Sequence, residues 1–355
     1  MKNSYFKGAS DPGLVDETIG RYLDRIAATY PDEPALVVRH QGIRWTWSQY
    51  HEEVEKLAAG LLAIGIETGD RVGIWAPNCY EWCVTQFATA KIGAVLVCVN
   101  PAYRVFELEY ALNKSGCKAI VAAERFKSSR YLEMLQRLAP ELNECEPGKL
   151  RAKKLPELEI VIRMGESHTS GMFNFQQVCD MGGAEQVQRI SEIDPELASG
   201  DVINIQFTSG TTGNPKGASL THYNILNNAN QVAAGMKLTQ ADRLCIPVPM
   251  YHCFGMVLGK LACVTRGATA VFPADAFEPG AVLATVEQER CTALHGGPTM
   301  FIAELEHPEF ERYDLSSLRT GIMAGAPCPV KVMKKVISRM HMSEVLIAYG
   351  QTECS

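Results

Sequence analysis

The sequence predicts an α/β protein with doubly wound, mostly parallel sheets flanked by helices. Two observations support this fold class. Short apolar segments of strand length alternate with amphipathic segments of helix length, and the apolar segments are continuous rather than alternating. Continuous apolar strands are typical of parallel sheets that are covered on both faces. A chain of 355 residues is also long for one domain, so we expect two or more compact units.

The first helix and strand repeats lie between residues 46 and 123. The stretch "TWSQYHEEVEKLAAGLLAIGI" opens with Thr46 and Gln49 at the spacing of a capping box, and Gly65 stands where a glycine ends a helix. Apolar runs predict strands at 71–76, 94–99 and 119–123, and periodic segments predict helices at 81–91 and 106–114. This order predicts a parallel sheet.

A less regular region follows, from about residue 138 to 199, with loop-like stretches "PGKLRAKKLPE" and "GESHTSG". The alternation resumes at "DVINIQF" (201–207). We therefore predict a first α/β part over residues 1–197 and a second over residues 198–355, although doubly wound units can interleave in sequence.

Composition narrows the class of protein. Hydrophobic content of 46% and charged content of 21% are those of a soluble globular protein, and a net charge of -6 argues against nucleic-acid binding. There is no signal-peptide pattern and no apolar run long enough for a bilayer, so we expect no transmembrane segment and a cytoplasmic location. Twelve scattered cysteines without a Cys-x-x-Cys pair predict reduced, mostly buried thiols.

The stretch "FTSGTTGNPKG" (207–217) separates the predicted strand at 201–207 from a predicted helix at 221–236 that Thr221 caps. Its glycines allow close approach to a ligand, its hydroxyls lie beside backbone N–H groups, and Lys216 offers a charge to a terminal phosphate. It is no Walker A loop, because Gly217 follows the lysine. The alternative is an ordinary surface turn. We predict phosphate binding by Thr208, Ser209, Gly210, Thr211, Thr212, Gly213, Asn214, Pro215 and Lys216.

This loop resembles the signature loop of the adenylate-forming superfamily, which includes acyl-CoA synthetases, peptide-synthetase adenylation domains and beetle luciferases. Three further stretches follow in the family's order: "PMYHCFGM" (249–256), "RTGIMAGAPCP" (319–329) and "YGQTECS" (349–355). Each alone is weak evidence, but four in order are specific. The resemblance runs from about residue 18 to 355 and implies the family's large N-terminal domain.

The resemblance also implies a role for each motif. His252 corresponds to the family's histidine at the acyl site, where we assign it a positioning role. The implied catalytic set is His252, Lys216, Thr352 and Glu353, with Glu353 as the ligand of Mg²⁺. Adenine and phosphate would be held by Gly325, Ala326, Pro327, Tyr349, Gly350, Gln351 and Thr352.

The implied reaction has two steps. A carboxylate attacks the α-phosphate of ATP to give an acyl-adenylate and pyrophosphate, and the thiol of coenzyme A then displaces AMP. The first step brings together two anions, so positioning and charge neutralisation should supply most of the catalysis. The implied cofactors and partners are ATP, Mg²⁺, coenzyme A and a fatty acid.

The class of carboxylic acid substrate is indicated by the absence of an acidic residue from the motif around His252. "PMYHCFGM" contains no Asp or Glu to pair with an amino group, so an α-amino acid is disfavoured. The candidate pocket walls are apolar stretches, which would suit an alkyl chain: "MVLGKLACV" (256–264) and "GGPTMFIAEL" (296–305). The alternative is that both stretches are ordinary core segments. "PTMFIAEL" most resembles the fatty acyl-CoA ligase branch, especially its medium-chain members, and aryl acids stay possible.

The sequence ends two residues after Glu353, whereas the resemblance implies roughly two hundred further residues, enough for another domain. Those residues would include a ribose-binding aspartate, a hinge and the mobile C-terminal lid domain with its lysine. We therefore expect an incomplete copy of a larger ligase with little complete turnover. The alternatives are a non-catalytic nucleotide- or acyl-binding relative with a regulatory role, and a luciferase-like monooxygenase.

Overall fold

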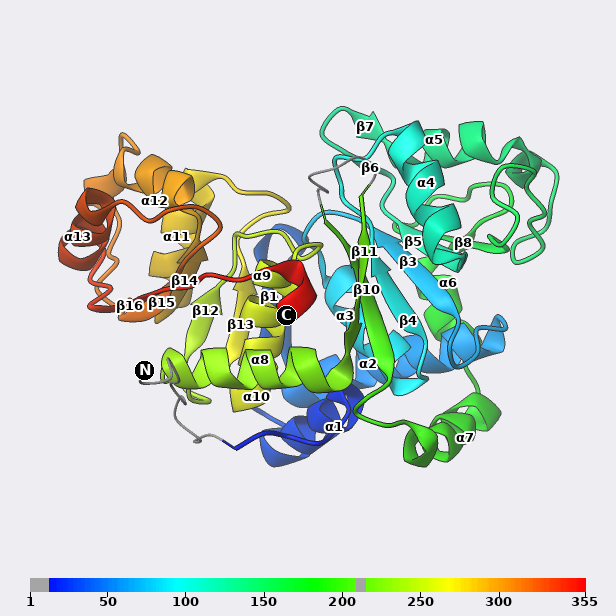
Figure 1. Ribbon diagram of the computed structural model, residues 1–355, viewed down its shortest axis with the longest axis horizontal. Helices are drawn as coiled ribbons and strands as arrows, with labels where there is room; N and C mark the ends of the chain where they lie inside the picture. The colour runs from blue at the N-terminus through cyan, green and yellow to red at the C-terminus, as the bar shows by residue number, and fades with distance from the viewer. Residues whose placement is uncertain (1–12, 209–214) are drawn as a thin grey trace, which may run out of the picture.

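The computed structural model describes residues 13–208 and 215–355, which form two seven-stranded sheets with helices between and around them (Figure 1). Sheet A has the order β16-β15-β14-β12-β13-β1-β2 and sheet B the order β11-β10-β4-β3-β5-β8-β9. Within the two sheets, neighbouring strands are parallel except the edge pairs β1–β2 and β10–β11. The predicted α/β class with mostly parallel sheets is confirmed.

Sheet A consists of β1 (Pro34–Val38), β2 (Ile43–Thr46), β12 (Arg243–Cys245), β13 (Thr269–Phe272), β14 (Ala293–Gly296), β15 (Thr320–Met323) and β16 (Glu344–Ile347). Sheet B consists of β3 (Arg71–Trp75), β4 (Val95–Cys98), β5 (Cys117–Ala122), β8 (Ile160–Arg163), β9 (Phe173–Asn174), β10 (Val202–Phe207) and β11 (Gly217–Thr221). A separate hairpin pairs β6 (Arg125–Phe126) with β7 (Ser129–Arg130).

The two sheets interleave in sequence. The chain first places β1 and β2 in sheet A, then builds sheet B from residues 71–221, and returns to sheet A with β12. Neither sheet ends at the expected boundary between residues 197 and 198, because β10 and β11 belong to the same sheet as β3. The two sheets therefore do not correspond to residues 1–197 and 198–355. The division of the chain into these two parts stays a prediction.

Successive side chains along the strands of sheet A point to opposite faces of the sheet, so these strands contribute to two different cores. Leu244 and Ala270 pack into the large core between the sheets, whereas their chain neighbours Cys245 and Val271 pack into a separate outer core. The large core is filled mainly by α1 (Ile19–Thr29), α2 (Trp47–Ala63), α3 (Tyr80–Lys91), α8 (His222–Gly235) and α10 (Ala262–Arg266). Because both faces are buried, these strands read as continuous apolar runs.

The other helices lie outside the sheets. Sheet B is covered on its outer face by α4 (Val105–Ser115) and α5 (Tyr131–Leu138). Sheet A is covered by α11 (Pro279–Glu289), α12 (Pro298–Leu305) and α13 (Val330–Arg339). Helices α6 (Phe175–Met181) and α7 (Ala184–Ile193) pack against α2 and add residues to the large core. Short helical turns include η1 (Arg39–Gln41), η2 (Pro140–Asn143), η3 (Asp194–Glu196) and η5 (Phe310–Arg312).

Local sequence signals were reliable. The capping box of α2 is present, with the Thr46 hydroxyl accepting from the Gln49 N–H, and Gly65 has the positive φ of 90° expected after the helix. The strands and helices predicted between residues 71 and 123 appear within two residues at each end. Sequence analysis did not find β8, α6 and α7 in the region that it treated as irregular.

Candidate active site

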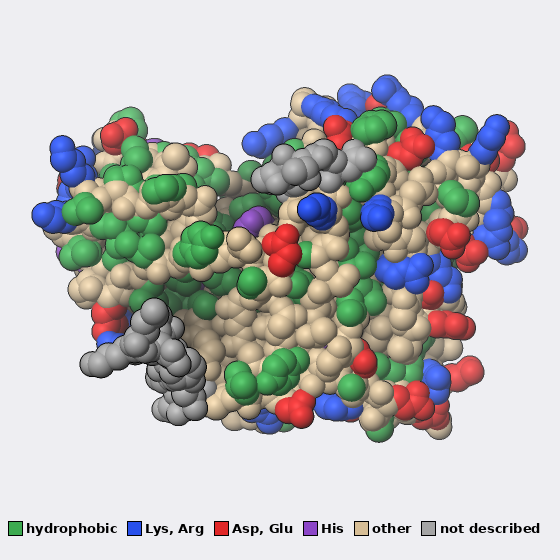
Figure 2. Space-filling view, in the orientation of Figure 1, with side chains coloured by type: hydrophobic (Ala, Val, Ile, Leu, Met, Phe, Trp, Pro, Cys, Tyr) green, Lys and Arg blue, Asp and Glu red, His purple; other side chains and the backbone are tan. Residues whose placement is uncertain are grey.

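A cavity of about 610 Å³ lies beside α8 and between the segments that follow β12, β15 and β16. Figure 2 shows a hollow between the two lobes of the molecule, with histidine surface inside it. Its walls bring together three of the four quoted motifs. The lining residues are Asn228, Val232, His252, Cys253, Phe254, Leu258, Ala324, Gly325, Ala326, Pro327, Cys328, Ile347, Ala348, Tyr349, Gly350, Gln351, Cys354 and Ser355.

His252 is held in place by the segment before it. Asn78 accepts a hydrogen bond from the Met250 N–H at 2.8 Å and donates to the Val248 carbonyl at 3.0 Å. At Gly255 a Cβ would lie 2.4 Å from the Pro249 carbonyl oxygen, so only glycine permits this close approach. Asn78 was missed in the sequence, where its position directly after a predicted strand was the available signal.

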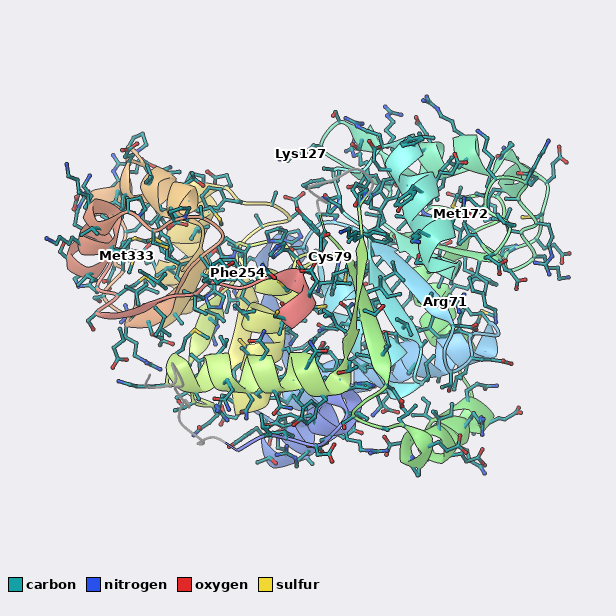
Figure 3. The ribbon with its side chains drawn as sticks, viewed as in Figure 1. Arg71, Cys79, Lys127, Met172, Phe254 and Met333 are labelled. Atoms are coloured by element: carbon teal, nitrogen blue, oxygen red, sulfur yellow. The ribbon has the colours of Figure 1, made fainter. Side chains whose placement is uncertain are left out.

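His252 caps a continuous helical segment made of α9 (Cys253–Gly255), the π-helix η4 (Met256–Leu261) and α10. Its Nδ1 accepts the Phe254 N–H at 3.1 Å, in the manner of an N-cap side chain. In Figure 3, Phe254 lies near the centre of the molecule, between the two sheets. No described residue hydrogen-bonds Nε2, which leaves that nitrogen for a ligand in the cavity.

His252 and Cys253 influence each other. The hydrogen bond with the Cys253 thiol, at 3.6 Å between Sγ and Nδ1, raises the pKa of His252, and burial opposes that shift. The Phe254 N–H points at the same nitrogen from a shorter distance and favours the neutral ring. We therefore assign the neutral tautomer with its proton on Nε2 to the resting site.

Directly behind this wall stands His295 of β14, which sequence analysis did not single out. Its Nε2 lies 2.9 Å from the Leu258 carbonyl, its Nδ1 accepts the Ile322 N–H at 3.2 Å, and its ring centroid is 5.2 Å from that of Phe254. Complete burial lowers its pKa to about 4, so the ring is neutral. His295 thus connects β14 and β15 to the π-helix that forms one wall of the cavity.

The segment that contains Gly325, Ala326 and Pro327 enters the cavity from the end of β15. Within that strand Gly321 has φ +143°, and a Cβ there would lie 1.9 Å from the Leu294 carbonyl oxygen. A glycine is therefore required where β15 passes β14. The structure thus places Gly325, Ala326 and Pro327 in the cavity wall, and their role in binding adenine stays a prediction.

The "YGQTECS" motif follows β16 and ends in η6 (Thr352–Cys354). Tyr349 is 92% exposed at the cavity edge, a very high value for an aromatic side chain and one that leaves its ring free to stack on a ligand. Gly350 and Gln351 line the cavity, whereas Thr352 and Glu353 do not. Glu353 is exposed, with no described residue as a hydrogen-bond or ion-pair partner.

The phosphate-loop prediction is described only at its two ends, because Ser209, Gly210, Thr211, Thr212, Gly213 and Asn214 lie outside the described residues. Thr208 N–H donates to the Lys216 carbonyl at 2.9 Å, and the Tyr110 hydroxyl donates to the Pro215 carbonyl at 3.2 Å. Strands β10 and β11 therefore hold both ends of the loop as a hairpin. Lys216 is exposed, and η6 packs beside β11, so Thr352 and Glu353 are neighbours of the strand that leaves the loop.

A second group of potential ligands lies on α1 and α2, away from these motifs. Asp24, His51 and Glu55 present atoms within 4.8 Å of one another. However, Lys91 Nζ lies 2.5 Å from the Asp24 carboxylate and 2.6 Å from that of Glu55. The lysine already supplies the positive charge there, so this cluster is a partly buried ion-pair network.

The fold is the one shared by solved adenylate-forming enzymes. The chain superposes on the anthranilate CoA ligase AuaEII in complex with anthranoyl-AMP with a TM-score of 0.81 at 23% identity, covering 96% of this chain and 60% of that one. It superposes on the inhibitor-bound N-terminal domain of FACL13 from Mycobacterium tuberculosis with a TM-score of 0.75 at 24% identity, covering 95% and 76%. At these identities the likeness concerns the fold.

The sequence comparison is more specific. Residues 23–355 match the AMP-binding enzyme family, and the chain belongs to it. "Putative acyl-CoA synthetase YngI" of Bacillus subtilis (strain 168) is 50% identical over 346 residues, which cover 96% of this chain and 62% of that protein. "Medium-chain acyl-CoA ligase ACSF2, mitochondrial" of Danio rerio is 44% identical over 357 residues, covering 100% and 59%. The chain thus spans about three fifths of the length of these relatives.

Among the described residues, no helix combines the length and the apolar character needed to cross a membrane.

Proposed function

We propose that this chain carries the adenylate-forming part of an AMP-forming acyl-CoA ligase, which joins a fatty acid to coenzyme A through an acyl-adenylate. The observation that carries the proposal is the cavity in which the three motifs around His252, Gly325–Pro327 and Tyr349–Gln351 meet. Residues more than 90 positions apart in the chain converge there with the types that the reaction needs. An ordinary surface turn at each motif would not predict this convergence.

Each side chain has a physical task in the first step. The neutral His252 ring donates from Nε2 to a carboxylate oxygen and so positions the acid without removing a proton. The exposed Tyr349 ring stacks on adenine, and the small residues Gly325 and Ala326 let the base approach the backbone. Lys216, with the hydroxyls of the loop, holds the departing pyrophosphate and offsets its charge.

The residues present fit a magnesium ion. Glu353 offers an exposed carboxylate without a described partner, and Thr352 offers a hydroxyl beside it. Hard oxygen ligands of this kind suit Mg²⁺, which usually binds through one or two carboxylates and substrate phosphates. A bound Mg²⁺ would neutralise phosphate oxygens of ATP, and Glu353 would be its protein ligand.

The apolar cavity wall supports a fatty acid as the substrate. Val232, Phe254, Leu258 and Ile347 line the cavity, and no described lining residue is an Asp or Glu that could pair with an amino group. The named medium-chain relatives lead us to propose an acid of medium length. An aryl acid is the alternative, and a competition series from octanoate to benzoate distinguishes the two.

The test is acid-dependent release of pyrophosphate and coenzyme A-dependent release of AMP by the protein as its source cell makes it. We expect octanoate to stimulate pyrophosphate release and Lys216→Met to lower the affinity for ATP by roughly tenfold or more, since hydrogen bonds to charged groups contribute about 1.5–3 kcal/mol. Lys334→Met, at an exposed lysine of α13, is the matched control. If ATP binds and no carboxylic acid stimulates release, the non-catalytic regulatory relative replaces the ligase.

The predicted cytoplasmic location also stays a proposal. The Danio rerio relative has "mitochondrial" in its name, which describes that protein. Fractionation of source cells followed by detection of this chain decides the question.

A further inference from the structure

We propose that the outward face of α13 docks on the surface of a lipid bilayer that carries negative charge. This face consists of Val330, Lys331, Lys334, Lys335 and Ile337, all of them exposed. The helix contains no acidic residue, although the whole chain has a net charge of -6. Basic and apolar side chains together on one surface helix are typical of proteins that bind anionic membrane surfaces.

The inward face of α13 already has a partner. Val336 and Met340 are fully buried in the outer core of sheet A, and Val332 and Met333 pack against that core. These four positions lie on one side of the helix, so this side anchors α13 to sheet A. A further partner must therefore contact the outward face.

The outward face combines apolar and basic side chains at helical spacing. Lys334 follows Val330 by four residues and precedes Ile337 by three, so the three side chains are neighbours on the helix surface. Val330 is 68% exposed and Ile337 is 43% exposed. Single exposed apolar residues are common, but here two of them flank a lysine. Figure 2 shows Lys and Arg side chains beside hydrophobic ones at the outer edge of the lobe that carries α13.

The three lysines of this face carry charge that the protein itself does not neutralise. Within residues 13–208 and 215–355, no hydrogen bond or ion pair engages the side chains of Lys331, Lys334 and Lys335. By contrast, Arg339 at the end of the helix pairs with Glu311. Each lysine held near an anionic bilayer strengthens binding by about fivefold, so charge complementarity favours this occupant.

The helix also begins close to the cavity. Pro327 lines the cavity, and Val330 starts α13 three residues later. Ala326, Pro327 and Pro329 are exposed, so apolar surface leads from the cavity wall to the helix. Uptake of a bilayer-dissolved acid through this side rests on the proposed function, whereas docking itself does not.

Co-sedimentation with lipid vesicles tests the proposal on the protein as its source cell makes it. We expect binding to vesicles of phosphatidylcholine mixed with phosphatidylglycerol and much weaker binding to phosphatidylcholine alone. Added salt should weaken the binding, because it screens exposed charges. Absence of binding to the anionic vesicles, or equal binding to both kinds, would overturn the proposal whether or not the protein is a ligase.

A triple variant shows whether α13 makes the contact. Lys331→Gln/Lys334→Gln/Lys335→Gln should weaken binding to the anionic vesicles by about 100-fold, from three lysines at about fivefold each. Urea unfolding should be nearly unchanged, because the three lysines are exposed and Gln is a good helix former. Undiminished vesicle binding by this variant would contradict docking through α13.

The matched control removes the same charge from the other lobe. Lys114, Lys153 and Lys154 are exposed, and Asn113 of α4 donates to the Lys154 carbonyl, so they also lie near one another. Lys114→Gln/Lys153→Gln/Lys154→Gln should bind the anionic vesicles within about fivefold of the unaltered protein. A loss as large as that of the α13 variant would show that net charge alone causes binding, which overturns the proposal.

The apolar part of the face has its own pair of variants. Ile337→Ser should weaken vesicle binding by about threefold or more, since it removes apolar surface from the contact. Val187→Ser, at a valine of α7 that is 49% exposed, should leave binding unchanged. If the unaltered protein ignores vesicles but associates with itself, and Ile337→Ser abolishes that association, the face is an interface between copies and the proposal is wrong.

Discussion

The cavity wall and the core directly behind it use the same side chain in opposite ways. His252, on the wall, commits one ring nitrogen to the Phe254 N–H and keeps the other for a ligand. His295, behind it, commits both nitrogens, to Leu258 and Ile322, and is fully buried. Phe254 contacts both histidines, because its N–H donates to His252 and its ring lies against the ring of His295. The difference shows that partners and burial, rather than residue type, decide whether a histidine is structural or available for chemistry.

The largest expected effect comes from removing the structural histidine. His295→Leu leaves the Leu258 carbonyl and the Ile322 N–H without their partner in the core. Because each buried unsatisfied group costs about 1–3 kcal/mol, we expect unfolding in urea to show a loss of about 2–5 kcal/mol. His168→Leu, at an exposed histidine, should change stability by less than about 0.5 kcal/mol. Equal losses in the free energy of unfolding for His295→Leu and His168→Leu would contradict the distinction between core and surface histidines.

The second effect is a pH dependence of stability. The folded-state pKa of His295 is about 4, below its ordinary value of 6.5, so the unfolded chain binds more protons as the pH falls from 6.5 towards 4. Stability should therefore be lost over that range, by up to about 3 kcal/mol for this residue.

Urea unfolding at pH 7, 6 and 5 measures this loss. His295→Gln cannot titrate, so its stability should fall less steeply with decreasing pH than that of the unaltered chain. Burial also lowers the pKa of His222 to about 4, and its share of the slope should persist in the variant. Identical slopes for the variant and the unaltered chain would show that folding does not lower the pKa of His295.

The smallest expected effect comes from the cavity histidine. His252→Asn keeps the cap on Phe254 and removes the Nε2 donor. We expect an unfolding free energy within about 1 kcal/mol of the unaltered chain, because Asn is a good N-cap residue. Calorimetry should show roughly fivefold weaker binding of a non-hydrolysable acyl-sulfamoyl adenosine, since one net hydrogen bond contributes about 1 kcal/mol.

His252→Leu separates the two tasks of the ring, because it removes the cap as well as the donor. Its stability should fall by about 1 kcal/mol beyond that of His252→Asn. Unchanged ligand binding in both variants would contradict the positioning role of His252.

Much of the fold could be predicted from local signals. The capping box at Thr46 and Gln49 and the continuous apolar strands depend on neighbours in the chain, so they predicted α2 and the parallel strands correctly. The interleaving of the two sheets could not be predicted, because β1 reaches β13 across more than 200 residues and local periodicity carries no information about strand order. The region with β8, α6 and α7 was missed because long loops there hide the alternation.

The candidate site divides in the same way. The sequence by itself determined the family motifs, the residue types of the cavity and the absence of an acidic partner for an amino group. Only the tertiary structure decided that three motifs share one cavity, that Asn78 and His295 support its wall, and that Cys253 hydrogen-bonds His252. The physical reason is that residue types and spacing are properties of the chain. Hydrogen-bond partners, burial and the resulting pKa shifts depend on segments that meet only after folding.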